Sequence, residues 1–174
     1  MIRNILVIKD GVPIVNECFG QCHTIKKNEL IVTGFIDALT SFSQQAFGSI
    51  VQEVKLEKYA ILVRKNSQKG VVTAFILDSN AELEEEKKKM EKAVKLFDEQ
   101  FAREADSFQG RDIAQFGTFR YLLLDEKIAE QNCGKNKDCG DCPNCNNVGE
   151  YLAKLKKFKR TLSMPRRYQM QVSS

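Results

Sequence analysis

Hydrophobic and polar positions alternate over the first part of the chain in a way that is typical of β-strands. Residues 2–9 and 12–19 are rich in β-branched side chains, and Asp10-Gly11 lies between them. This dipeptide tolerates the positive backbone angles of a tight type I′ turn. The pattern therefore predicts an N-terminal β-hairpin.

After the hairpin, the hydrophobic period changes to that of an α-helix. Asn28 can cap the start of this helix, and Gly48 follows its end. Its apolar residues recur at steps of three and four positions, and they are Ile31, Phe35, Ala38, Leu39, Phe42 and Ala46.

Three further β-rich runs follow, over residues 50–56, 59–64 and 71–77, with the clearest turn at 66–70. We expect them to form antiparallel strands. The predicted fold class is therefore α/β, of the α+β type, with a five-stranded antiparallel sheet.

A long amphipathic helix is predicted over residues 81–108. Its apolar stripe must lie on the sheet, and consists of Leu83, Met90, Val94, Phe97, Phe101, Ala105 and Phe108. The run Glu84 to Glu86 followed by Lys87 to Lys89 is best explained as a helix start with ion pairs between turns. Shorter helices are predicted over 116–128 and 148–162.

Composition favours one folded domain. The chain has 174 residues, 43% of them hydrophobic, which suffices for one core. No apolar run approaches the roughly 18 residues of a membrane span, so we expect a cytoplasmic protein. The net charge of +4 is unevenly distributed, at +2 for residues 1–80, −4 for 81–131 and +6 for 132–174.

The order of these elements, β-β-α-β-β-β-α-α, resembles the longin domain. The opening ILVIKDGVPIV has the strand, DG turn and strand of the wider longin and roadblock group. The roadblock arrangement is a circular permutation that begins with a helix, so a hairpin start favours longin. The resemblance covers residues 1–130 and leaves a cysteine-rich loop, 131–147, and a basic helix and tail, 148–174, unexplained.

The resemblance implies a non-catalytic platform for small GTPases, trafficking coat or tethering subunits, and SNARE-type partners, often paired with another such domain. Its docking surface is the outer side of the first helix and the edge strand after it. Here these positions are Leu30, Gly34, Asp37, Ser41 and Gln45 on the helix, with Ile50, Gln52 and Val54 on the strand. An edge strand offers unpaired backbone groups, and Gly34 and Ser41 let a partner approach closely. The alternative is that all are ordinary solvated positions.

Four cysteines have the spacing C-x5-C-x2-C-x2-C, and they are Cys133, Cys139, Cys142 and Cys145. The Gly, Asn, Asp and Pro between them allow four thiolates to surround one ion, as in structural Zn²⁺ sites. An iron-sulfur cluster, a disulfide and metal-free thiols remain open. Cys18, Cys22 and His23 could add ligands, but Cys18 is better explained as a small apolar strand residue.

The C-terminal segment is basic and amphipathic. Leu152, Leu155, Phe158 and Leu162 have helical spacing, and the charges between and after them are Lys154, Lys156, Lys157, Lys159, Arg160, Arg166 and Arg167. An anionic membrane, a nucleic-acid backbone or an acidic protein groove would each suit it. Alternatively, the apolar side docks on the domain.

No Walker loop, dinucleotide fingerprint or catalytic constellation is found in the sequence. The first hypothesis is therefore a non-enzymatic adaptor or small-GTPase-regulating scaffold that forms a homodimer or heterodimer and carries structural zinc. The second is a metal- or redox-responsive protein whose basic helix binds nucleic acid or a membrane surface.

Overall fold

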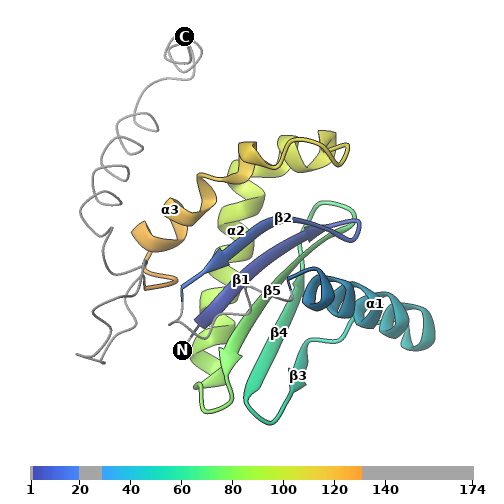
Figure 1. The fold of residues 1–174 in the computed structure, drawn as a ribbon, viewed down its shortest axis with the longest axis vertical. Coiled ribbons are helices and arrows are strands. Elements are labelled where there is room, and N and C mark those ends of the chain that lie inside the picture. The colour runs from blue at the N-terminus through green and yellow to red at the C-terminus, as the bar shows by residue number, and fades with distance from the viewer. Residues whose placement is uncertain (1, 20–28, 131–174) are drawn as a thin grey trace, which may run out of the picture.

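The computed structural model describes residues 2–19 and 29–130 of the chain. They form one antiparallel sheet with helices on both faces (Figure 1). The described elements follow the predicted order, β-β-α-β-β-β-α-α, with a short 3₁₀ turn before the last helix. The α/β fold class predicted from the sequence is therefore confirmed.

The sheet is built from five strands in the spatial order β2-β1-β5-β4-β3. Their bounds are Ile2–Lys9 for β1, Val12–Cys18 for β2, Glu53–Lys55 for β3, Tyr59–Lys65 for β4 and Val71–Asp78 for β5. The β1-β2 turn has positive φ at both central residues, 47° at Asp10 and 81° at Gly11, as a type I′ turn requires. The predicted hairpin is thus confirmed.

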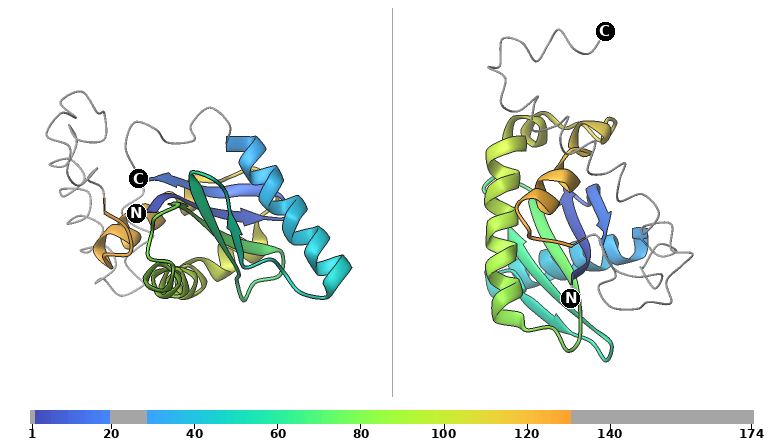
Figure 2. Two further views of the ribbon diagram at one scale, coloured as in Figure 1. Left: turned by 90° about the horizontal axis from the view of Figure 1, so that it is seen from below. Right: turned by 90° about the vertical axis from the view of Figure 1, so that its left-hand side faces the viewer.

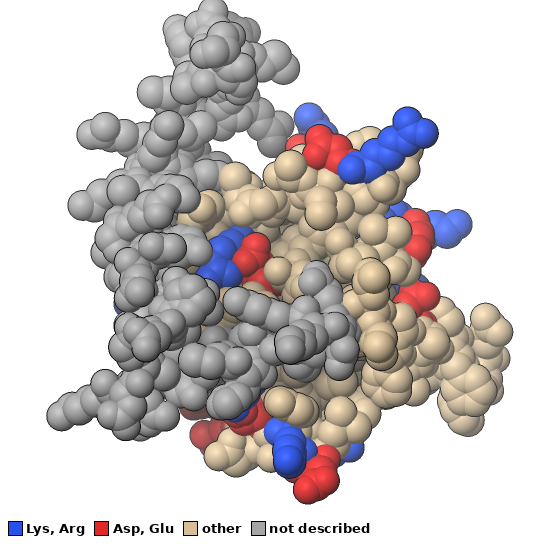
Figure 3. All heavy atoms as spheres, viewed as in Figure 1, with Lys and Arg blue, Asp and Glu red and all other residues tan. Residues whose placement is uncertain are grey.

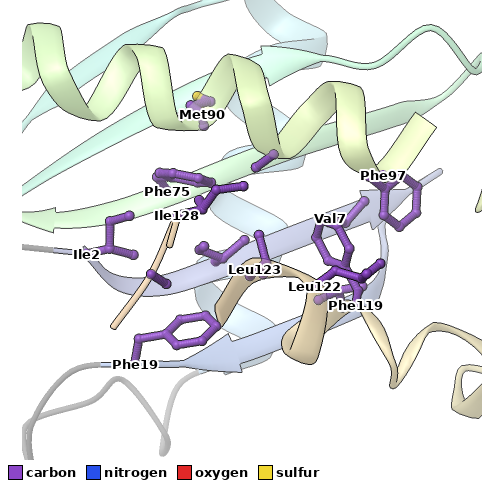
Figure 4. Packing of buried hydrophobic residues seen from close by; sticks show 14 of the residues in the cluster. Ile2, Val7, Phe19, Phe75, Met90, Phe97, Phe119, Leu122, Leu123 and Ile128 are labelled. Atoms are coloured by element: carbon purple, nitrogen blue, oxygen red, sulfur yellow. The ribbon is translucent and has the colours of Figure 1, made fainter. Parts of the chain in front are cut away.

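One face of the sheet is covered by α2 (Leu83–Ser107), η1 (Ala114–Phe116) and α3 (Phe119–Asp125), and α1 (Glu29–Phe47) lies on the other (Figure 2, left). The α2 face holds the larger core. Met90, Phe97 and Phe101 are buried on the sheet side of α2, as the stripe predicted. The rings of Phe97 and Phe101 meet those of Phe116 and Phe119. Figure 4 shows Phe97, Phe119 and Val7 together at one end of this core.

The acidic and basic residues at the start of α2 form ion pairs at a spacing of three residues. Lys87 Nζ lies 2.8 Å from a carboxylate oxygen of Glu84, and Lys89 Nζ lies 3.1 Å from one of Glu86. The predicted pairing across turns is confirmed, at a spacing of three residues where four was expected. Glu86 differs from its neighbours because it is buried.

An ion pair joins α3 to the edge strand β2. Arg120 donates to the carboxylate of Glu17 at 2.5 Å and to the carbonyl of Cys18 at 3.1 Å, and its guanidinium lies 4.8 Å from the ring centre of Phe19. Burial raises the pKa of Glu17, and the hydrogen bond and charge of Arg120 lower it by less. Ionising the Glu17 carboxylate in the folded protein therefore costs free energy.

Two boundaries differ from the sequence prediction. The strand expected over 50–56 is paired only over Glu53–Lys55, although the carbonyl of Gln52 accepts one bond from the N–H of Val63 at 2.9 Å. The helix expected over 116–128 is split into η1 and α3. No helix of residues 2–19 and 29–130 is long and apolar enough to cross a membrane.

Candidate protein-docking surface

The first helix turns a mostly polar side toward its own sheet. Thr33, Ile36, Thr40 and Ser43 are buried at steps of three and four residues, and Ile36 is the only large apolar side chain among them. Ile36 packs on a small cluster with residues of β1, β4 and β5, including Leu6 and Ile76. Half-buried Val32 packs on the same cluster. The short Thr and Ser side chains add little buried apolar surface to this contact.

Ile31, Phe35 and Phe42 lie on the opposite side of α1, and Leu30 and Phe47 are exposed near its two ends. We call these five residues together the outer face of α1. Its exposed members, with their exposed fractions, are Leu30 (77%), Ile31 (71%), Phe35 (45%), Phe42 (63%) and Phe47 (74%). The rings of Phe42 and Phe47 meet edge to face, with centroids 6.1 Å apart, near the end of the helix. Most of the stripe seen in the sequence therefore faces away from the sheet.

The apolar area of this face approaches that of a protein interface. If a fully exposed large apolar residue presents roughly 200 Å², the five residues together expose about 650 Å². Specific interfaces bury roughly 800 Å² per partner, and the largest apolar patch of an ordinary monomer is roughly 300–600 Å². An uncovered face of this size is typical of a surface that binds a partner.

The outer face of α1 also lacks charge. Between Asp37 and Glu53 the sequence contains no Asp, Glu, Lys or Arg. The C-terminal half of α1, at the right of Figure 3, accordingly carries neither blue nor red atoms. A partner for this face must therefore be apolar and does not need a charged patch of either sign.

Of the five helix positions implied by the longin resemblance, Leu30 belongs to this apolar face and the other four lie beside it. Leu30, Gly34, Ser41 and Gln45 are exposed, and a Cβ added at Gly34 would meet nothing within 4 Å. Asp37 differs, because it is half-buried and its carboxylate oxygen lies 3.4 Å from the position that a Cβ on Gly11 would take. The predicted positions are accessible with the exception of Asp37.

The strand part of the predicted surface is smaller than expected. β3 lies at the edge of the sheet, but Ile50 and Gln52 precede it, and only Val54 of the three predicted residues belongs to the strand. Val54 is half-buried against the same cluster as Ile36. Correcting the sequence prediction, the edge strand has three residues and does not include Ile50 or Gln52.

The contact residues predicted from the sequence did not include Ile31, Phe35, Phe42 or Phe47. The available signal was that α1 carries apolar side chains around most of its circumference, whereas a helix on one face of a sheet needs only one apolar stripe. The second stripe is not needed for packing against the sheet.

The predicted metal and anion sites lie outside the described residues. These are the four cysteines Cys133, Cys139, Cys142 and Cys145 and the seven basic residues of 154–167. Cys22 and His23, which were not predicted to be ligands, also lie outside the described residues. Cys18 is half-exposed at the end of β2, where its sulfur accepts a hydrogen bond from the amide of Asn4 at 3.0 Å. Within residues 2–19 and 29–130, no three His, Cys, Asp or Glu side chains are grouped as metal ligands.

Neither a comparison with protein-family models nor one with curated proteins finds a match. Among solved structures, the chain is similar to one described as "MglB with tetrameric arrangement", with 15% sequence identity and a TM-score of 0.37. The similarity covers 60% of this chain and 75% of that chain. A likeness this distant carries no functional conclusion.

Proposed function

We propose that this chain is a non-catalytic protein-interaction module, an adaptor or small-GTPase-regulating scaffold, that docks through the outer face of α1. The observation that carries the proposal is that Ile31, Phe35 and Phe42 point away from the domain's own sheet while Thr33, Thr40 and Ser43 point toward it. Exposing five large apolar side chains has no role in the fold of the isolated domain, but it suits a surface that is covered in a complex.

The occupant of this face is a second copy of the chain. An uncharged apolar surface is complementary to itself, and a two-fold axis through it would bring the same residues of both copies together. Ile31, Phe35, Ala38 and Phe42 also follow the alternating four- and three-residue spacing by which two helices interlock. Pairing of two α1 helices would cover the face on both copies at once.

The longin resemblance adds the class of further partner, a small GTPase or a trafficking subunit bound by the dimer. The same resemblance implies that the chain is a regulator or platform and not an enzyme. Structural Zn²⁺ held by Cys133, Cys139, Cys142 and Cys145 is a further part of this proposal.

The experiment compares Gly34→Arg with the wild type. Because the added side chain enters open space, Gly34→Arg should fold normally and prevent close approach of the partner helix. The matched control is Gln100→Arg, which adds the same side chain at an exposed position of α2 on the other side of the sheet. Light scattering should show a dimer for the wild type and the control and a monomer for Gly34→Arg. Unchanged association of Gly34→Arg would remove this surface from the proposal.

The GTPase part is tested separately, with purified small GTPases of the host loaded with GDP or a GTP analogue. Binding that depends on the nucleotide and is weakened by Gly34→Arg supports the regulatory scaffold. Equal binding in both nucleotide states, or no binding, would contradict the GTPase role. The dimer is tested independently by light scattering.

A further inference from the structure

A small cavity lies on the α2 side of the sheet, where the start of β1, the first turns of α2 and the segment after α3 come together. Its volume is about 200 Å³, or roughly six or seven water molecules. The side chains of Ile2, Ile128 and Ala129 form its apolar wall. Figure 4 shows Ile2 and Ile128 on the side of the core away from Phe97.

The first polar group of the cavity is a buried carboxylate. Glu86 is only 6% exposed, whereas the neighbouring Glu84 side chain is 80% exposed. One oxygen of Glu86, Oε1, accepts a hydrogen bond from Lys89 at 3.1 Å. The other, Oε2, is buried and has no hydrogen-bond partner. Buried polar atoms are normally paired, so this oxygen lacks a donor that the described residues do not supply.

Two further charges stand at the rim of the cavity. Lys127 and Glu130 both line it and are exposed, and neither forms an ion pair with another described residue. Lys127 is held in a left-handed conformation, with φ of 53°, at the turn that follows α3. Among the described residues, the cavity thus combines a half-satisfied carboxylate with an ammonium group and a second carboxylate that form no ion pair there.

We infer that this cavity binds a small zwitterion of the size and charge of a free α-amino acid. The ammonium group of the ligand donates to Glu86 Oε2, and the carboxylate of the ligand accepts from Lys127 and Lys89. Rotation about the terminal bond of Glu86, which is a broad torsion, presents Oε2 to the cavity. The apolar wall receives the ligand's side chain.

Charge complementarity favours a zwitterion over other ligands. Lys89 and Lys127 balance Glu86 and Glu130, so the lined cavity has no net formal charge. A metal ion would be repelled by two lysines, and a simple anion would be repelled by two carboxylates. A ligand with both charges, separated by a few bonds, meets a partner for each.

The inference goes beyond the proposed function, because the cavity is lined by residues of α2 and of the segment after α3. These elements and α1 lie on opposite faces of the sheet (Figure 2). The amino-acid site and the docking function of α1 can therefore each fail without the other.

The test uses the full chain and a panel of the standard amino acids, first by thermal shift and then by calorimetry on those that stabilise it. At least one should bind with Kd of about 1 mM or tighter. n-Butylamine and n-butyrate, which carry one charge each, should bind about tenfold more weakly or not at all.

Two variants locate the site. Glu86→Gln should weaken binding about tenfold, and the matched control Glu84→Gln, on the same turn of α2 but exposed, should leave it unchanged. Lys127→Met, at an exposed position, should also weaken binding. This variant tests the site if Glu86→Gln does not fold. The inference is overturned if no amino acid binds, if n-butylamine binds as tightly as the best amino acid, or if Lys127→Met and a folded Glu86→Gln bind normally.

Discussion

The hydroxyl oxygen of Ser43 accepts a hydrogen bond from the backbone N–H of Val51 at 2.9 Å, which ties the end of α1 to the segment that enters β3. The same hydroxyl donates to the carbonyl of Thr40 at 3.1 Å. Since Ile36 is the only fully buried apolar side chain described in α1, with Val32 half-buried beside it, this polar contact is an important part of the attachment of the helix to the sheet. The position of the outer face of α1 therefore depends on Ser43.

Ser43→Ala should destabilise the domain by about 1 kcal/mol, because the N–H of Val51 loses its acceptor. Urea unfolding measures the loss, and hydrogen exchange should show faster opening of α1 than of β1 and β5. Ser41→Ala, two positions along the same helix and exposed, is the control and should change stability by less than about 0.5 kcal/mol. Equal effects of the two variants would contradict the role given to Ser43.

The same substitution at two phenylalanines should distinguish the core from the outer face of α1. Phe97 is fully buried and its ring meets those of Phe101, Phe116 and Phe119, so Phe97→Ala should cost about 3–5 kcal/mol. Phe42→Ala, measured in dilute monomeric protein, should cost less than about 0.5 kcal/mol. A large loss for Phe42→Ala would mean that this ring supports the fold of the monomer.

The strands and α2 could be predicted from the sequence because each has a single set of apolar positions that can face the core. In α2, for example, only the stripe through Met90, Phe97 and Phe101 can cover the sheet, since Glu and Lys occupy the other sides. For α1 two stripes compete, one through Ile31, Phe35 and Phe42 and the other through Ile36. Periodicity cannot decide which of them meets the sheet, because a residue that packs against a partner has the same chemistry as one that packs in the core.

The bounds of β3 and the burial of Glu86 also could not be predicted from the sequence. Strand pairing depends on the register against β4, which a run of β-branched residues such as Ile50 to Val54 does not specify. Glu86 belongs to a run of six charged residues, and only the approach of Ile2 and Ile128 from distant parts of the chain encloses it.

The raised pKa of Glu17 gives a pH-dependent contribution to stability. Burial disfavours the charged form, so the folded state holds the proton of Glu17 more tightly than the unfolded chain, whose pKa is about 4.3. The stabilising contribution is complete below that value and is lost as the pH rises through the folded pKa. The difference in unfolding free energy between the wild type and Glu17→Gln should therefore shift against the wild type as the pH rises from about 4, and become constant above the folded pKa. A shift in favour of the wild type would contradict burial as the dominant cause.

The cysteine-rich loop gives a prediction about metal content. Replacing Cys139 and Cys142 with Ser should lower bound zinc, measured by atomic emission, because a four-thiolate site loses half its ligands. The unfolding transition of the sheet and α2 should persist, since their core is complete without the loop. An iron signature in the wild type would contradict zinc, and loss of the folded sheet in the variant would contradict an independent domain.

The most direct test of the central claim is sedimentation equilibrium on the wild type and on a variant with Phe35→Ser and Phe42→Ser together. If the outer face of α1 joins two copies, the wild type should sediment as a dimer that dissociates on dilution, and the variant should remain a monomer with the circular dichroism of the wild type. A wild type that is monomeric at every concentration, or a variant that still forms the dimer, would contradict the claim.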